Sequence, residues 1–283
     1  MNRLPLELRV QVLNALVEGN SIRGTCRMTG VAKGTAIRLL EDVGDARDLY
    51  QDETIRNLTC VRVQCDEIWS FCQKKERRVR FEERGQDIGD LWTWTAIDAD
   101  TELVICWFLG KRTAADADVF IRDLSQRISS FVQISTDGFS FYNEPIQRRF
   151  GYRADHGSEV KDYGLLDDAS PERKYSPMVV KRVVRKEIWG APMPEYISTA
   201  YVERQNLKMR MSMRRFTRLT NGFSKKAQNL QRALALHFMY YNFCRKHQTL
   251  KTTPAIKAGL TNRIWTLHDL ARLPDIMRDS KAA

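Results

Sequence analysis

The sequence predicts an α/β fold, a mixed sheet with flanking helices, preceded by a small all-helical domain. Apolar residues first recur at helical spacing, within residues 1–43. From residue 61 onward, short runs of branched and aromatic residues follow, and one amphipathic helical stretch separates them. Residues 44–60 are charged and lose the periodicity, so we expect a linker or bridging helix between the two parts.

Residues 1–43 predict three short helices. The first has apolar residues at helical spacing, at Leu6, Val10, Leu13 and Val17. Ser21 is expected to cap the second helix, and a turn at 29–31 separates it from the third. This is the outline of a helix-turn-helix, whose third helix would present Lys33, Thr35 and Arg38 to the major groove of DNA. A plain helical bundle fits the same pattern.

Four strands are expected next, at residues 61–69, 91–97, 103–109 and 131–136. Thr113 has the spacing to Asp116 of a capping box, and it would begin a helix ahead of the fourth strand. A strand-helix-strand crossover makes parallel neighbours, so the fourth strand should return beside the first. Three meandering strands, a crossover helix and a fourth strand are the elements of a ribonuclease H-like fold. Residues 152–156 are the best candidate for its fifth strand.

The predicted catalytic domain spans 61–248 and carries an insertion at about 157–195. Residues 157–176 have a loop-like composition, whereas 178–189 mix valines with basic residues such as Lys181 and Arg182. That segment could be a basic hairpin that grips a DNA backbone, or a solvated insertion. The remaining residues, 249–283, are expected to form a C-terminal tail with one weak helix at 267–273.

The charge and composition of the chain limit the classes of partner that it is expected to bind. The chain has 46 Lys and Arg against 35 Asp and Glu, a net charge of +11, which favours nucleic acid over an anionic membrane surface. A basic protein with a merely solvated surface is the alternative. No run approaches the ~20 apolar residues of a membrane span, and the N-terminus lacks a signal-peptide core, so we expect a cytoplasmic protein. The six cysteines form no Cys-x-x-Cys pair, which makes structural zinc unexpected.

Three acids occupy positions where a core element would normally exclude charge. Asp66 lies within the first strand, Asp137 ends the fourth, and Glu203 lies in a helical stripe that is otherwise apolar, at Tyr196, Ala200, Leu207 and Met211. Carboxylates brought together repel one another unless cations offset them, and Mg²⁺, or Mn²⁺ in its place, prefers oxygen ligands. Two such ions could activate a water or a DNA 3′-hydroxyl for displacement at phosphorus, so hydrolysis and transesterification both stay open.

Each acid also has a structural interpretation. Asp66 could face solvent at a strand end, and Asp137 could belong to a simple turn. Glu203 could form an ion pair with Arg210 two turns later. His156 is a weak candidate for a catalytic base, because a histidine at a strand end is more often a satisfied polar residue.

A basic run follows Glu203 without one intervening acid, at Arg204, Lys208, Arg210, Arg214, Arg215 and Arg218. On a single helix, such a run would form a surface that tracks DNA phosphates. Its affinity for DNA would fall steeply with salt.

Several segments together resemble the DDE transposases of bacterial insertion sequences, and among these the insertion-sequence-one family. They are Cys65-Asp66-Glu67-Ile68-Trp69-Ser70, Ser135-Thr136-Asp137-Gly138, the strings at 201–207 and 210–218, and the closing segment at 241–247. The resemblance covers essentially the whole chain. The string around Glu203 is highly specific for this family, whereas Thr-Asp-Gly alone would be weak evidence for it.

The resemblance implies a ribonuclease H-like catalytic domain with Asp66, Asp137 and Glu203 as its metal-binding triad. It further implies cleavage at the terminal inverted repeats of a mobile element and attack by the freed 3′-hydroxyls on target DNA, by a homodimer or higher oligomer. Arg210 would contact a phosphate near the scissile bond. Some family members carry a zinc-binding segment ahead of the helix-turn-helix, but no cysteine precedes Cys26 here, so no zinc is expected. A non-catalytic repressor, a domesticated transposase and a nuclease without strand transfer are the alternatives.

Overall fold

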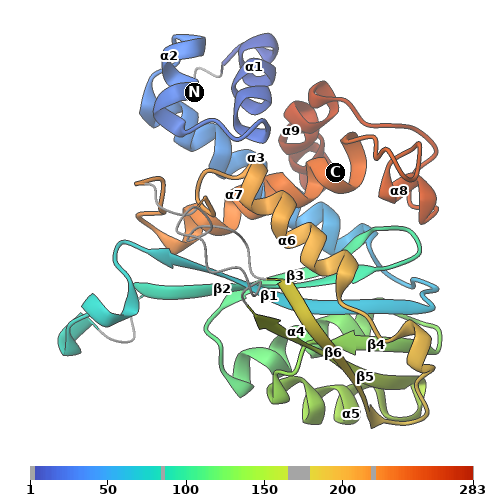
Figure 1. The fold of residues 1–283 in the computed structure, drawn as a ribbon. Helices are drawn as coiled ribbons and strands as arrows, with labels where there is room; N and C mark the ends of the chain where they lie inside the picture. Colours follow the sequence, from blue (N-terminus) through green and yellow to red (C-terminus); the bar gives the residue numbers. More distant parts are fainter. Residues whose placement is uncertain (1–3, 84–86, 165–178, 218–220, 283) are drawn as a thin grey trace.

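A mixed six-stranded sheet forms the centre of the molecule (Figure 1). The computed structural model describes residues 4–83, 87–164, 179–217 and 221–282. The strands lie in the order β3-β2-β1-β4-β5-β6. Their bounds are Arg62–Cys72 for β1, Gly89–Asp98 for β2, Val104–Gly110 for β3, Val132–Thr136 for β4, Ala154–Gly164 for β5 and Val179–Trp189 for β6. The sheet is consistent with a ribonuclease H-like fold.

Strand β4 returns parallel to β1, as the crossover predicted. Gln64 of β1 pairs with Ser135 of β4 in this register. Asp66 and Asp137 each lie two residues further along, so the register brings them to the same level at the end of β4. The fold therefore brings together two acids that are far apart in the sequence.

Helices cover both faces of the sheet (Figure 1). Helices α4 (Ala114–Arg127) and α5 (Asn143–Phe150) pack on one face around Trp94, which is fully buried. Helices α6 (Ala200–Ser212) and α7 (Ala227–Met239) cover the other face. The predicted cap of α4 is present, since the Thr113 hydroxyl accepts a hydrogen bond from the Asp116 amide at 3.2 Å.

Three helices form the N-terminal part, at Leu6–Val17 (α1), Ile22–Thr29 (α2) and Lys33–Thr54 (α3). The predicted Ser21 cap is present, because its hydroxyl accepts from the Gly24 amide at 3.0 Å. Helix α3 continues eleven residues beyond the predicted end at Val43. Its charged second half is helical because it packs along α7, where Arg232 forms ion pairs with Glu41 and Asp45. A bridging helix, one of the two expectations for this stretch, therefore connects the two parts.

The C-terminal residues contribute more structure than the weak helix predicted at 267–273. A short helix, α8, spans Pro254–Lys257, and α9 spans Leu267–Ala282. Helix α9 packs against α1 and α3, and its Ala271 is fully buried in the N-terminal core. Tertiary burial thus extends a helix whose periodicity alone was weak. No helix among the described residues has both the length and the hydropathy that a membrane crossing requires.

Residues 157–164 form a strand where a loop was predicted, and residues 179–189, which were expected to be a basic hairpin or a solvated insertion, form a second strand. Strand β5 continues to Gly164, and β6 pairs with it antiparallel, so the described part of this stretch is a hairpin that extends the sheet. Residues 157–159 are buried, which explains a strand where composition indicated a loop. Lys181 and Arg182 lie exposed on β6, and the connection at 165–178 lies outside the described residues.

Candidate active site

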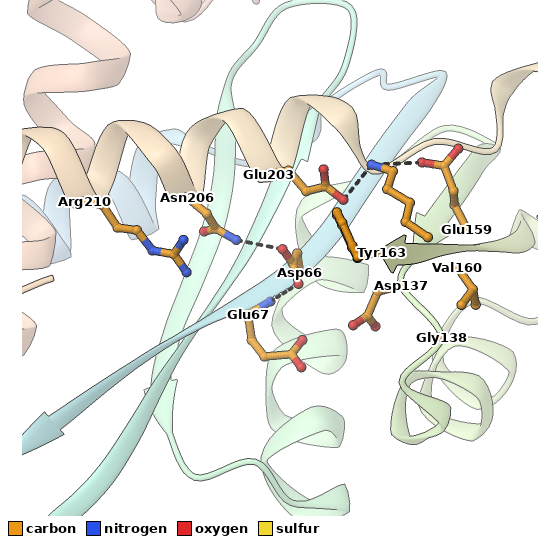
Figure 2. Close-up of a pocket in the computed structure, with 11 residues that line it drawn as sticks. Asp66, Glu67, Asp137, Gly138, Glu159, Val160, Tyr163, Glu203, Asn206 and Arg210 are labelled. Atoms are coloured by element: carbon orange, nitrogen blue, oxygen red, sulfur yellow. Dashed lines mark hydrogen bonds and ion pairs between the residues drawn. The ribbon is translucent and has the colours of Figure 1, made fainter. Parts of the chain in front are cut away.

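Asp66, Asp137 and Glu203 line one cavity of about 450 Å³ (Figure 2). Asp66 projects from β1, Asp137 follows the last residue of β4, and Glu203 belongs to the first turn of α6. The cavity also has lining residues from β5, among them Glu159 and Lys161. The fold therefore gathers the three predicted acids from three separate elements.

The tightest acidic cluster consists of Asp66, Glu67 and Asp137. One carboxylate oxygen from each lies within 4.8 Å of the others. Glu67 was not among the residues predicted for the site, and consecutive residues of a strand normally point to opposite faces of the sheet. Strand β1 extends past the end of β4, however, and at that edge both side chains reach the space beside Asp137.

Glu67 is anchored on both of its carboxylate oxygens. Its Oε1 accepts from Arg112 Nε at 2.6 Å, and its Oε2 accepts from the Tyr142 hydroxyl at 2.8 Å. The same Arg112 brings Nη2 to 3.8 Å from Asp137 and lies over the Phe139 ring at 4.0 Å. Glu67 thus holds a cation beside Asp137, which offsets part of the negative charge of the cluster.

Helix α6 is fixed to β1 by side-chain amides. The Gln64 side chain accepts from the Tyr201 amide at 2.7 Å, near the start of the helix. One turn after Glu203, Asn206 Nδ2 donates to Asp66 Oδ2 at 2.7 Å, while Asp66 Oδ1 accepts from the Glu67 amide at 2.8 Å. These bonds set the distance between Glu203 and the acidic cluster and fix the Asp66 carboxylate in one orientation.

Glu203 itself is held by a lysine. Its Oε1 lies 2.7 Å from Lys161 Nζ and accepts from the Thr199 hydroxyl at 2.7 Å. The expected alternative partner, Arg210, lines the same cavity two turns along α6. Lys161 escaped sequence reasoning because it lies in the stretch that was predicted to be a loop.

The apolar stripe that singled out Glu203 is not the buried face of α6. Leu207 is 54% exposed and Met211 is 76% exposed. The buried apolar positions are instead Val202 and Met209, which pack on the sheet. Glu203 lies half-buried between the two faces. The start of the helix was predicted correctly, but its inward side was assigned to the wrong residues and its end was not predicted.

Burial and mutual repulsion raise the proton affinity of the cluster. Burial, with the neighbouring charges of Glu67 and Asp137, raises the pKa of Asp66 to about 7. Burial likewise raises the pKa of Glu67 and of Asp137. Such a set of closely spaced hard oxygen donors suits a divalent cation, whose charge would favour the deprotonated forms. The residues present therefore fit a Mg²⁺ or Mn²⁺ site.

The basic run after Glu203 does not lie on one helix. Helix α6 ends at Ser212, so Arg214 and Arg215 lie beyond it, and Arg218 is outside the described residues. Arg204 is exposed on the helix, whereas Lys208 is half-buried and lies 3.7 Å from Glu102. Among the described residues of this run, only Arg210 lines the acidic cavity.

A second cavity, of about 910 Å³, lies between the N-terminal helices and residues 212–237. Six basic residues of the described chain line it: Arg23, Lys33, Arg214, Arg215, Lys225 and Lys226. The one acid among its described lining residues, Glu41, forms an ion pair with Arg232 at 2.9 Å. Arg215 is half-buried, has no hydrogen-bonding or ionic partner within the described part of the chain, and has a pKa lowered by burial. We call this space the basic cavity.

The remaining predicted residues lie elsewhere. Thr35 is half-buried and Arg38 exposed on α3, and the Arg38 guanidinium lies 3.5 Å from the Thr35 hydroxyl. His156 is fully buried, 2.9 Å from the Thr136 hydroxyl, and burial lowers its pKa to about 4. His156 is absent from the lining of the acidic cavity, so it is a core histidine, and its Nδ1 has no hydrogen-bond partner among the described residues.

Comparison with known proteins bears on the fold. No protein-family model matches the chain, and no curated protein matches it significantly. Among solved structures, the chain is similar to a piggyBac transposase in a synaptic complex with hairpin DNA, with a TM-score of 0.50 and 12% sequence identity. The match covers 98% of this chain and 72% of that chain. At this identity the likeness establishes a shared fold.

Proposed function

We propose that this chain is a DNA transposase that binds the ends of an insertion sequence, cleaves them and joins the 3′-hydroxyls to target DNA. The observation that carries the proposal is the convergence of Asp66, Asp137 and Glu203 on one cavity. The fold shared with a piggyBac transposase supports it. So does the resemblance of the sequence around these acids to insertion-sequence transposases.

The proposed chemistry is a displacement at phosphorus. Asp66, Asp137 and Glu203 would hold two divalent cations, which supply Lewis-acid stabilisation of the attacking and leaving oxygens when bound. Asn206 keeps the Asp66 carboxylate oriented through its hydrogen bond. Arg112 offsets charge at Asp137. Arg210 would offer its guanidinium to a phosphate oxygen beside the cleaved bond.

The basic cavity supports a path for DNA toward these acids. It lies between the predicted helix-turn-helix, which contributes Lys33 to its lining, and the segment that follows α6. A DNA backbone in this space would meet several cations and no unpaired acid among the described lining residues. We propose that two chains or more assemble on DNA, since two element ends must be brought together.

The test is a transposition reaction with purified full-length protein. A donor plasmid would carry the gene with its flanking DNA, and a second plasmid would serve as target. We expect cleavage at the element ends and donor-target joints with Mg²⁺ or Mn²⁺, and neither with EDTA. Cleavage without joints would indicate a nuclease. DNA binding with neither cleavage nor joining, in Mg²⁺ and in Mn²⁺, would indicate a repressor or domesticated protein.

Arg215→Gln is expected to weaken DNA binding about tenfold. Its guanidinium lines the basic cavity without a described partner, so removing it deletes a phosphate contact and no ion pair. The slope of log affinity against log salt should fall by about one phosphate equivalent. Fluorescence anisotropy with a labelled duplex, between low and moderate salt, measures both quantities.

The matched control is Arg122→Gln, which removes an exposed arginine on α4. Helix α4 lies on the opposite face of the sheet from α7, which contributes to the lining of the basic cavity (Figure 1). It should leave the affinity and the salt slope unchanged. Equal effects of the two substitutions would mean that only net charge matters, and the basic cavity would not be a DNA path.

A further inference from the structure

Lys161 is a cation inside an acidic cavity. It lies on β5, and its side chain is only 15% exposed. The ammonium nitrogen is 2.7 Å from Glu203 Oε1 and 3.3 Å from Glu159 Oε1, so it bridges two carboxylates (Figure 2). At these distances the ammonium group forms an ion pair with each carboxylate.

The two carboxylates of this bridge are not equivalent. Glu159 is buried and has other partners, since it accepts from Arg185 Nε at 3.2 Å and from the Thr199 amide at 3.3 Å. Glu203 is half-buried, faces the cavity, and has Lys161 as its ionic partner. Glu159 therefore fixes the position of the ammonium group, and Glu203 is the partner that could be exchanged.

Lys161 also explains why Glu203 is absent from the tight cluster. Among the described residues, Asp66, Glu67 and Asp137 bring carboxylate oxygens within 4.8 Å of one another, and Glu203 is not part of that group. Its Oε1 is instead held by Lys161 and Thr199. A metal ion shared between the cluster and Glu203 would have to take that oxygen from the ammonium group.

We propose that Lys161 is a built-in counter-cation that occupies Glu203 in the metal-free protein and competes with a divalent metal ion for that carboxylate. Lys161 is thus a positioning residue that sets the metal affinity of the site. The inference rests on the proposed function only in taking the acidic cavity as a metal site. It concerns binding in the absence of DNA.

The test is a calorimetric titration of the full-length protein with Mn²⁺ alone, in the absence of DNA. Lys161→Met removes the competing charge, and we expect Mn²⁺ to bind about tenfold more tightly, because a partly buried charge interacts strongly at this range. Lys161→Arg keeps a cation and should retain weak binding. In a Glu203→Gln background, Lys161→Met should leave the affinity unchanged, since the contested carboxylate is gone.

Lys186→Met controls for net charge, because it removes an exposed lysine from β6 of the same hairpin. It should not change the Mn²⁺ affinity. Thermal unfolding without metal checks that each variant is folded. Equal or weaker binding by a folded Lys161→Met variant would overturn the proposal, as would tightening that persists with Glu203→Gln.

These outcomes separate the two proposals. Mn²⁺ binding that tightens in Lys161→Met supports the counter-cation even if no DNA is cleaved. Metal-dependent cleavage with no change in Mn²⁺ affinity would leave the transposase proposal standing and overturn this one. Absence of Mn²⁺ binding in both the unmodified chain and Lys161→Met would overturn the counter-cation proposal, whereas the transposase proposal is decided by the cleavage assay.

Discussion

Asp66→Asn is expected to slow metal-dependent DNA cleavage by about 10³-fold or more. Charge stabilisation by a bound metal is worth several kcal/mol, and each ~1.4 kcal/mol is a factor of ten in rate. Asn has nearly the same shape but a single neutral oxygen. Asp66 uses both oxygens, toward Asn206 and the Glu67 amide, so the substitution removes a ligand charge and disturbs the bond to α6.

The measurement is the initial rate of donor-plasmid cleavage at saturating Mg²⁺. Glu195→Gln is the control, because it neutralises an exposed acid just ahead of α6 that does not line the acidic cavity. It should retain full activity. A cleavage rate for Asp66→Asn within tenfold of the unmodified chain would show that the chemistry occurs elsewhere.

The same substitution is expected to stabilise the metal-free protein, by about 2–4 kcal/mol in the free energy of unfolding at pH 8. The folded state raises the pKa of Asp66 from its ordinary value of 3.8 to about 7. Ionised Asp66 therefore destabilises the fold. That penalty is absent below pH 4, grows as the pH rises toward 7, and is complete above it. Asn carries no charge and avoids it.

Urea unfolding in EDTA at pH 5, 6, 7 and 8 measures this effect. The advantage of Asp66→Asn should grow with pH across this window. Mn²⁺ at pH 8 should reverse it, because the ion stabilises only the chain that retains its ligand. A difference in unfolding free energy that is constant with pH would contradict a raised pKa at Asp66.

The proximity of Asp66 and Asp137 could be predicted from the strand topology that the sequence implies. Branched residues marked β1 and β4, and the crossover rule made them parallel neighbours, which is enough to bring Asp66 beside Asp137. Glu203 was identified by reasoning that the structure corrects, because Leu207 and Met211 face solvent. Its helix is held by polar bonds from Gln64 and Asn206, and hydrophobic periodicity carries no information about such bonds.

The unpredicted residues share a cause. Glu67 reaches the site because β1 extends past the end of its neighbour β4. Lys161 reaches it because a polar stretch pairs into the sheet as part of β5. Both are properties of strand pairing, which a single chain read in order does not reveal. The end of α6 at Ser212 was equally hidden, and it separates Arg214 and Arg215 from the helix that carries Arg210.

The packing of α9 on α1 and α3 joins the two ends of the chain. Ala271 fills the core of the N-terminal helices, so those helices lack part of their interior until α9 has been made. During translation, the N-terminal helices would leave the ribosome well before α9 and would complete their core only when α9 emerges.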